Sequence, residues 1–312
     1  MRICFFCKSP TGIHLKEHRL SLCPTCYPSW VEDQVAKTIK RFKMFVPQEK
    51  ILLAVSGGKD SLSLWQILTR LGYVVHAFYI SLGIKEENYS DISKEKCLIM
   101  AQKLSLPLHI VDLQKESGYN LNQVSKAYYK TCSACGVIKR YFMNQITLKE
   151  NYSVVATGHN LDDEVSTLFG NVLRWDETYL NRQYPVIPPK AGLAKKVKPL
   201  IFLSEKQVAL YALTSEIDYI RHECPYSTHA SSLRYKENLH QLESYNAGTL
   251  RFFLTNFLNF RKKQIKEQEE KKEIKEVALY LCSSCQQLST SKMCKYCSIM
   301  QKVAQRAKKN GG

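Results

Sequence analysis

The sequence predicts a doubly wound, parallel α/β sheet with a small metal-binding module at each end of the chain. Apolar, strand-like runs alternate with helix-like segments through the middle of the sequence. One of these runs leads into a glycine-rich turn that is followed at once by a helix. Ten of the 12 cysteines form five Cys-x-x-Cys pairs, and four of these pairs lie near the chain ends.

The net charge of +17 is concentrated at the two ends of the 312-residue chain. Residues 1–50 carry a balance of +5, residues 51–250 carry +3, and residues 251–312 carry +9. This segregation favours a nucleic-acid partner over a merely solubilising lysine surface. No run of 18 apolar residues and no apolar leader is present, so we expect a cytoplasmic protein with no membrane partner.

The terminal cysteines have the spacing of structural zinc sites. Two Cys-x-x-Cys knuckles supply four thiolates, which close a tetrahedral shell and leave no position open for catalysis. We therefore expect zinc-ribbon modules with two Zn²⁺ per chain, in a reducing compartment. The first set is Cys4, Cys7, Cys23 and Cys26, and the second is Cys282, Cys285, Cys294 and Cys297.

A phosphate-binding turn is predicted between a strand and a helix. Ile51–Val55 is a continuous apolar run, as a strand buried on both faces requires. Ser56–Ser61 reads Ser-Gly-Gly-Lys-Asp-Ser, and the helix predicted over 62–71 ends at Gly72. Glycines let backbone N–H groups approach an oxyanion, and the helix N-terminus adds its dipole. The spacing matches neither a Walker A loop nor a dinucleotide fingerprint.

The rest of the middle region continues the alternation of strands and helices. We expect strands at 73–80, 108–112 and 153–157, and helices at 91–104 and 205–217. Ligands of such sheets bind at the carboxyl ends of the strands. Ser56, Tyr79–Ser81 and Gly158–His159 would meet at that edge.

A third cysteine set consists of Cys132, Cys135 and the distant Cys224. Three interpretations stay open: a redox disulfide of the first two, a zinc site completed by His222, or an iron–sulfur cluster with one iron lacking a protein ligand. Spacing alone does not choose among them. Lys139 follows Cys135 by four residues, so a helix places both on one side.

The basic segments outside these motifs can be interpreted without any role in binding RNA. The lysine-bearing segment 188–199 is predicted to be a loop that either contacts RNA phosphates or serves as a solvated connector. One long helix is expected over 246–276, with the phenylalanines at 252, 253, 257 and 260 in the core. We divide the chain into residues 1–29, 30–250 and 251–312.

These motifs resemble known families. Ser56–Ser61 resembles the PP-loop of the N-type ATP pyrophosphatases, which cleave ATP to AMP and pyrophosphate on a Rossmann-like sheet. The whole chain resembles the TtuA-type tRNA 2-thiouridine synthetases of the wider TtcA/TtuA group. The resemblance rests on the cysteine sets, the PP-loop, Lys139 and the run Gly158–Glu164.

The resemblance implies ATP-dependent thiolation of a tRNA uridine, with adenylation of the C2 oxygen and its replacement by sulfur. It implies a [4Fe–4S] cluster on Cys132, Cys135 and Cys224, whose unique iron carries the sulfur. It gives catalytic roles to Asp60, Lys139 and Asp163, with Mg²⁺ or the loop positioned by Asp60. ATP would bind at Ala54, Ser56, Gly57, Gly58, Lys59, Asp60, Ser61, Ile80, Gly158 and His159.

The resemblance also implies a homodimer that acts on U54 of the T-loop and takes sulfur from a ubiquitin-like thiocarboxylate carrier or from sulfide. The same chemistry at wobble U34 or at C32 is one alternative. An amide- or amidine-forming ATP pyrophosphatase is another, but it leaves the three core cysteines idle. A non-enzymatic zinc-ribbon RNA adaptor leaves the PP-loop unexplained.

Overall fold

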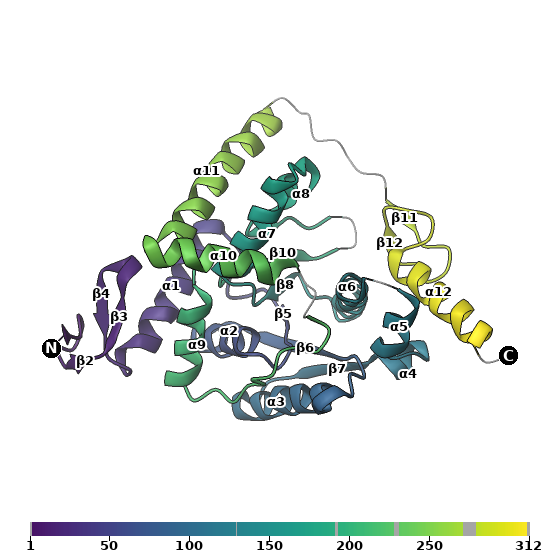
Figure 1. Ribbon diagram of the computed structural model, residues 1–312, viewed down its shortest axis with the longest axis horizontal. Helices are drawn as coiled ribbons and strands as arrows, with labels where there is room; N and C mark the ends of the chain where they lie inside the picture. The colour runs from purple at the N-terminus through teal and green to yellow at the C-terminus, as the bar shows by residue number, and fades with distance from the viewer. Residues whose placement is uncertain (1, 129, 191–192, 228–230, 271–278, 311–312) are drawn as a thin grey trace.

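The computed structural model describes residues 2–128, 130–190, 193–227, 231–270 and 279–310. A central sheet lies between layers of helices, with the N-terminal and C-terminal modules at opposite ends of the long axis (Figure 1). None of the helices in these ranges is both long and apolar enough to cross a membrane.

The six-stranded sheet has the order β7-β6-β5-β8-β10-β9. Its strands are β5 (Ile51–Ala54), β6 (Val75–Ser81), β7 (Leu108–Asp112), β8 (Val154–Thr157), β9 (Val186–Ile187) and β10 (Lys195–Val197). All neighbours pair in parallel except β10 and β9, which are antiparallel. The predicted doubly wound sheet is therefore confirmed, with one antiparallel edge strand added.

The chain reverses its direction of strand addition between β5 and β8. It leaves β5 toward β6 and β7, and then returns to β8 on the other side of β5. Such a switch point opens a crevice at the carboxyl ends of the two central strands. The first three residues of each strand are fully buried, which explains their unbroken apolar runs.

Two helical layers cover the sheet. One face packs against α1 (Cys26–Phe42), α2 (Lys59–Arg70), α3 (Tyr89–Leu104) and α9 (Glu205–Thr214). The other packs against α5 (Leu121–Ala127) and α6 (Thr131–Lys149). A third cluster joins α7 (Leu161–Leu173), α10 (Ser231–Tyr245) and α11 (Thr249–Glu270). Shorter helices are α4 (Leu113–Ser117), α8 (Glu177–Arg182), η1 (Lys16–His18) and η2 (Glu86–Asn88).

The terminal modules are small ribbons. The N-terminal one pairs β1 (Arg2–Ile3) with β2 (Pro10–Thr11) and β3 (Ile13–Leu15) with β4 (Leu20–Leu22). The C-terminal one pairs β11 (Tyr280–Leu281) with β12 (Leu288–Ser289) and continues into α12 (Lys295–Asn310). Two-residue and three-residue strands cannot bury a core alone, so each module needs its cysteines and its docking surface.

Three expectations from the sequence need correction. Segment 188–199 is not only a loop, because it contains β10. The predicted helix 246–276 begins at Thr249 and follows a separate helix, α10, while residues 271–276 lie outside the described ones. Of its phenylalanines, Phe253 and Phe257 pack against the third cluster, but Phe252 and Phe260 are 72% and 57% exposed.

The PP-loop is packed too tightly at Gly57 for a side chain. Gly57 has φ of +75°, and a Cβ there would lie 2.5 Å from the carbonyl oxygen of Ser93. Gly57→Ala should therefore lower the free energy of unfolding by more than about 2 kcal/mol, as chemical denaturation would measure. Gly72 has a similar φ of +83°, but a Cβ there would meet no described atom within 4 Å beyond its chain neighbours, so Gly72→Ala should cost only about 1 kcal/mol. Equal losses would contradict the steric contact.

Candidate active site

The PP-loop is held by its own hydroxyl groups. Ser61 Oγ accepts a hydrogen bond from the backbone N–H of Ser56 at 3.1 Å and donates one to the carbonyl of Gly58 at 3.1 Å. Gly58 is the N-cap of α2 and supplies no side-chain acceptor to the first turn. The first-turn N–H groups of a helix lack partners within the helix, so this end is suited to bind an anion.

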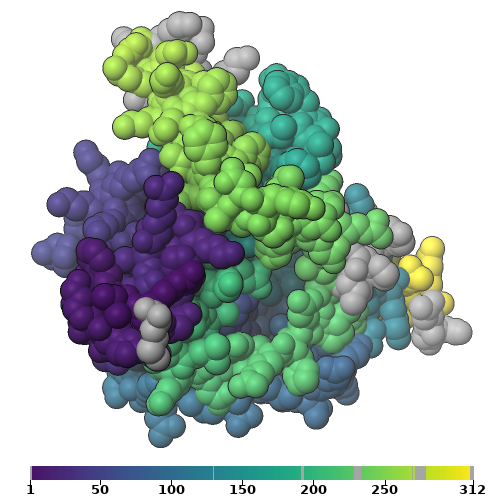
Figure 2. Space-filling view, turned by 60° about the vertical axis from the view of Figure 1, so that its left-hand side comes forward, coloured from purple at the N-terminus to yellow at the C-terminus, as the bar shows by residue number. Residues whose placement is uncertain are grey.

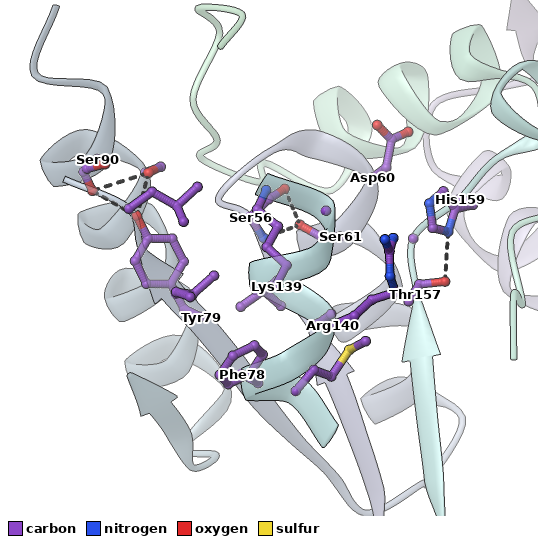
Figure 3. A pocket seen from close by; sticks show the side chains of 18 of the residues that line it. Ser56, Asp60, Ser61, Phe78, Tyr79, Ser90, Lys139, Arg140, Thr157 and His159 are labelled. Carbon is purple, nitrogen blue, oxygen red and sulfur yellow. Dashed lines mark hydrogen bonds between the residues drawn. The ribbon is translucent and has the colours of Figure 1, made fainter. Parts of the chain in front are cut away.

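A cavity of about 410 Å³ lies at the carboxyl edge of the sheet (Figure 3). It is bounded by β5, β6, the N-terminal turns of α2 and α7, and one side of α6. The structure brings together there ten residues singled out by the sequence, namely Ala54, Ser56, Asp60, Ser61, Tyr79, Ile80, Lys139, Gly158, His159 and Asp163. Other lining residues, among them Ser90, Ser93 and Arg140, carry no sequence motif that would single them out.

Three predicted ATP-binding residues, Gly57, Gly58 and Lys59, do not line this cavity. The Lys59 ammonium lies 2.8 Å from Glu205 Oε1 and 3.2 Å from Asp60 Oδ2. Burial opposes the charge, but these two carboxylates outweigh it and raise the pKa of Lys59. The ammonium thus orients Asp60, while the backbone of Lys59 remains part of the first turn of α2.

Lys59 faces a second cavity, of about 620 Å³, between the N-terminal module and helices α9, α10 and α11. Figure 2 shows this side of the molecule hollowed between α9 and α10, with the purple N-terminal module beside them. Because Lys59 lines this cavity and contacts Asp60, which lines the first, the two cavities lie on either side of that ion pair.

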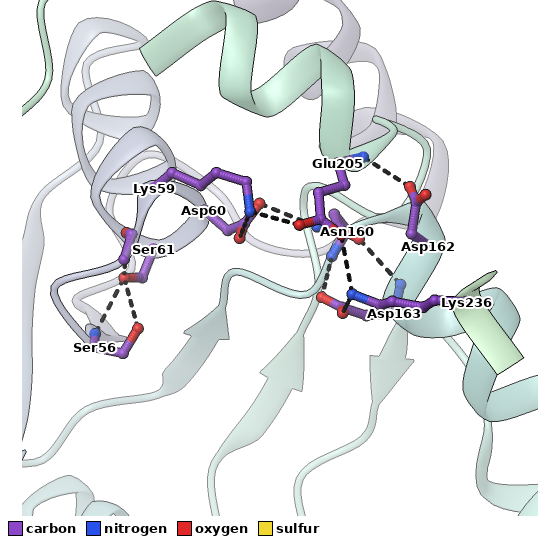
Figure 4. A network of polar contacts seen from close by, with 10 residues as sticks. Ser56, Lys59, Asp60, Ser61, Asn160, Asp162, Asp163, Glu205 and Lys236 are labelled. Carbon is purple, nitrogen blue, oxygen red and sulfur yellow. Dashed lines mark hydrogen bonds and ion pairs between the residues drawn. The ribbon is translucent and has the colours of Figure 1, made fainter. Parts of the chain in front are cut away.

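A charged network joins four helices beside the first cavity (Figure 4). Lys236 of α10 lies 2.7 Å from Asp163 Oδ1 of α7 and 3.1 Å from Glu205 Oε2 of α9. Asn160 Nδ2 donates a hydrogen bond of 3.0 Å to Asp60 Oδ1 of α2. Burial raises the pKa of Asp60, although Lys59 and Asn160 oppose this rise. Neither Glu205 nor Lys236 stood out in the sequence, because each sits on an ordinary amphipathic helix.

Helix α6 carries two cysteines of the third set, Cys132 and Cys135, which together with Cys224 form the cysteine corner. Cys132, Cys135 and Lys139 follow one another at spacings of three and four residues, which places them along one face of the helix. The chain after α9 returns to this face, where Cys132 Sγ donates a hydrogen bond of 3.0 Å to the carbonyl of Tyr226. Cys224, two residues earlier, packs against the same cluster as Cys135.

The surroundings of these cysteines bear on the three open interpretations. Burial raises the pKa of Cys224, and Lys139 opposes the rise, so all three cysteines and Lys139 share one electrostatic environment. His222 lies 3.8 Å from Glu87, and the described residues show no group of three or four ligands for a single ion at this corner. Three thiols spaced more widely than the terminal sets fit a ligand larger than one ion.

The terminal cysteines form two compact four-sulfur groups. In each set all four Sγ atoms lie within 4.8 Å of one another. Burial disfavours the thiolates, but backbone N–H groups outweigh it and lower the pKa of both Cys4 and Cys282 to about 6. Both groups therefore fit a single tetrahedral thiophilic ion.

The C-terminal module contacts the cysteine-bearing helix directly. Tyr141 of α6 stacks on Tyr296 of α12 with ring centroids 3.7 Å apart and an interplanar angle of 9°. Burial raises the pKa of Tyr141, and the neighbouring Cys285 of the second four-sulfur group raises it further. No sequence pattern predicts this contact, because it joins segments about 150 residues apart.

Comparison with known proteins identifies relatives of the chain. Residues 31–234 match the PP-loop domain family. The chain is 40% identical to the tRNA-5-methyluridine(54) 2-sulfurtransferase of Thermus thermophilus, covering 98% of this chain and 94% of the relative. The Pyrococcus horikoshii protein of that name is 37% identical, covering 94% and 92%. Among solved structures, the U34-tRNA thiolase NcsA of Methanococcus maripaludis with its [4Fe–4S] cluster shares the fold, with a TM-score of 0.79, 24% identity and 96% coverage of both chains.

The charged network predicts an acid-sensitive stability. Burial disfavours the Glu205 carboxylate, but Lys59 and Lys236 lower its pKa from 4.5 to about 2. The stability that this carboxylate supplies is fully present above about pH 4.5 and is lost as the pH falls toward 2. In denaturation at several pH values, Glu205→Gln should therefore show a shallower loss of stability than the wild type between about pH 5 and 3.

A matched control comes from α10. Glu237 is exposed and makes no ion pair among the described residues. Glu237→Gln should follow the wild-type pH dependence. Parallel curves for Glu205→Gln and the wild type would show that the two lysines do not stabilise the carboxylate.

Proposed function

The chain belongs to the PP-loop family and, within it, to the tRNA 2-sulfurtransferases, and from this premise we propose that it thiolates U54 of tRNA at the expense of ATP. The observation that carries the proposal is the shared wall of the first cavity. Lys139 and Gly136 of α6 line the same cavity as Ser56 and Ser61 of the PP-loop. The same helix carries Cys132 and Cys135, so activation of the uridine by ATP and delivery of sulfur would both take place at this cavity.

The choice of U54 follows the nearer relatives. Those named for position 54 are 37–40% identical to this chain, whereas the cytoplasmic tRNA 2-thiolation proteins are 27–29% identical and the U34-tRNA thiolase is 24% identical. Thiolation at U34 or C32 is therefore the weaker alternative. Amide-forming chemistry leaves the cysteine corner unused, and a non-enzymatic adaptor has no need of the cavity behind the PP-loop.

ATP would place its β- and γ-phosphates at Ser56–Ser61 and the N-terminus of α2. The backbone N–H groups of Gly57, Gly58 and Lys59 belong to this turn and suit an oxyanion. Asp60 lines the cavity as an oxygen donor positioned by Lys59 and Asn160. A bound Mg²⁺ would neutralise phosphate charge at this donor. Ala54, Ile80, Gly158 and His159 would complete the nucleotide site.

The reaction needs a good leaving group at C2 of the uracil. Adenylation of the C2 oxygen makes it part of AMP, which a sulfur nucleophile can displace. Lys139 has no hydrogen bond or ion pair among the described residues, so its ammonium is available to stabilise charge on the activated oxygen. Asp163 faces the same cavity, where the backbone N–H of Asn160 and the ammonium of Lys236 orient its carboxylate.

Cys132, Cys135 and Cys224 would hold a [4Fe–4S] cluster. Three thiolates leave one iron without a protein ligand, and the cluster thereby supplies a binding place for the sulfur to be transferred. Cys132 and Cys135 lie on the same face of α6 as Lys139, which lines the cavity. The sulfur donor would be a ubiquitin-like thiocarboxylate carrier or sulfide.

The terminal four-sulfur groups would hold two Zn²⁺ per chain. The division into a first module (1–29), a catalytic region (30–250) and a last module (251–312) is supported by the family match over 31–234. Cysteines that bind metals rather than forming disulfides suit the reducing cytoplasm. A homodimer is proposed from the family resemblance.

The function is tested by the products of ATP turnover with tRNA. Asp60→Ala or Ser61→Ala should lower AMP and pyrophosphate formation on the order of 100-fold. The first change removes the carboxylate proposed to bind Mg²⁺, and the second removes the hydroxyl that holds the PP-loop in shape. Ser63 is a matched control on the same helix, since its buried hydroxyl has no hydrogen-bond partner among the described residues. Ser63→Ala should keep wild-type turnover. ADP and phosphate as wild-type products would refute the proposal.

The cysteine corner is tested by metal content together with thiolation. Cys132→Ala, Cys135→Ala and Cys224→Ala should each lose the iron–sulfur absorbance and tRNA thiolation, but retain about two zinc ions per chain. Adenylation should suffer less, because the PP-loop lies on another segment. Cys97 belongs to a different buried cluster from Cys135 and Cys224, so Cys97→Ala should keep the iron–sulfur absorbance. Full thiolation by iron-free protein would exclude the cluster.

A further inference from the structure

One wall of the active-site cavity carries cations that have no counterion in the part of the chain that the structure describes. Lys139 and Arg140 both line the cavity, and Figure 3 shows Arg140 extending from α6 toward Thr157 and His159 at the end of β8. Neither side chain makes a hydrogen bond or ion pair with any residue that the structure describes. The guanidinium folds over the first part of the helix, with Nη1 3.2 Å from where a Cβ on Gly136 would lie.

Lys196 adds a third cation beside this wall. It stands opposite Val155 in the parallel pairing of β10 with β8, so the two side chains share one face of the sheet. Val155 packs there against the cluster that contains Ile138 and Phe142 of α6. The Lys196 side chain consequently lies half-buried beneath α6, where Arg140 acts on its charge.

The lysines that neighbour Lys196 in the sequence both have acidic partners. Lys195 lies 3.0 Å from Glu49, and Lys198 lies 2.7 Å from Glu164. Lys196 alone of these three has no acidic partner among the described residues. Burial lowers the pKa of Lys196, and Arg140 lowers it further. A half-buried cation beside a second cation is costly unless an anion joins them.

We propose that Arg140 and Lys196 form a phosphate-binding subsite at the edge of the active-site cavity, occupied when substrate is bound. The inference rests on the proposed function and adds two residues that bind the substrate. A guanidinium offers paired N–H donors and an ammonium a compact charge, a combination that suits phosphate oxygens. The phosphate belongs either to the tRNA backbone beside the reacting nucleotide or to ATP. The tRNA backbone is favoured, because the PP-loop already offers backbone N–H groups to the nucleotide.

The test measures binding of full-length protein to an unmodified tRNA transcript and, separately, to a non-hydrolysable ATP analogue. Arg140→Gln and Lys196→Met should each weaken the affinity for one of these ligands about tenfold. If the ligand is tRNA, the slope of log affinity against log salt should also fall by about 0.7–0.9 over a range of about 50–200 mM salt. Weaker binding of the ATP analogue alone would place the subsite on the nucleotide.

Three controls separate the subsite from general charge and from folding. Lys149 is exposed on the same helix nine residues after Arg140, so Lys149→Gln should leave both affinities within about twofold of wild type. Lys196→Met should keep or raise the free energy of unfolding, since it removes a half-buried unpaired charge. Lys196→Arg keeps the positive charge and should therefore retain the affinity that Lys196→Met loses.

Wild-type affinity for both ligands in Arg140→Gln and Lys196→Met would overturn the subsite. A wild-type protein that binds neither tRNA nor the ATP analogue would instead refute the proposed function. The two failures are therefore distinguishable in one set of measurements.

Discussion

The meeting of three helix N-termini at the carboxyl edge of the sheet governs the rest of the structure. The first turns of α2, α7 and α9 contribute Asp60, Asp163 and Glu205. Helix N-termini carry partial positive charge, so acids are stabilised there, but three carboxylates in one place repel each other. Lys59 and Lys236 resolve this conflict by bridging them. The bridges also fix the positions of α2, α7, α9 and α10 around the cavity.

Charge is distributed unequally across that cavity. On the PP-loop side, each of the three carboxylates lies within 3.2 Å of a lysine ammonium. On the α6 side, Lys139 and Arg140 have no such partner among the described residues. A polyanionic ligand would thus be attracted toward the helix that bears Cys132 and Cys135. The unpaired positive charge and the cysteine corner therefore lie on the same side of the cavity.

The sequence was most informative where the chemistry is local. The strand, glycine turn and helix at 51–71, and the two terminal cysteine sets, depend on spacing within a few residues, and the structure places them as expected. The roles of Lys236 and Arg140 depend on which segments pack together, which spacing does not encode. The strand β10 was not predicted because two of its three residues are lysines, which are typical of loops. In the structure the aliphatic parts of these lysines cover the sheet, and Val197 is buried.

The stack of Tyr141 on Tyr296 gives the assembly of the protein an order. The helix that presents Cys132 and Cys135 is braced by a module whose own fold depends on its four sulfurs. A chain that matures without an ion at Cys282–Cys297 would lack this brace, and its two helical thiols would meet an incoming cluster less well aligned. On the proposed metal assignments, filling of the terminal set would precede full alignment of Cys132 and Cys135, so a shortage of the terminal ion would also lower the cluster content.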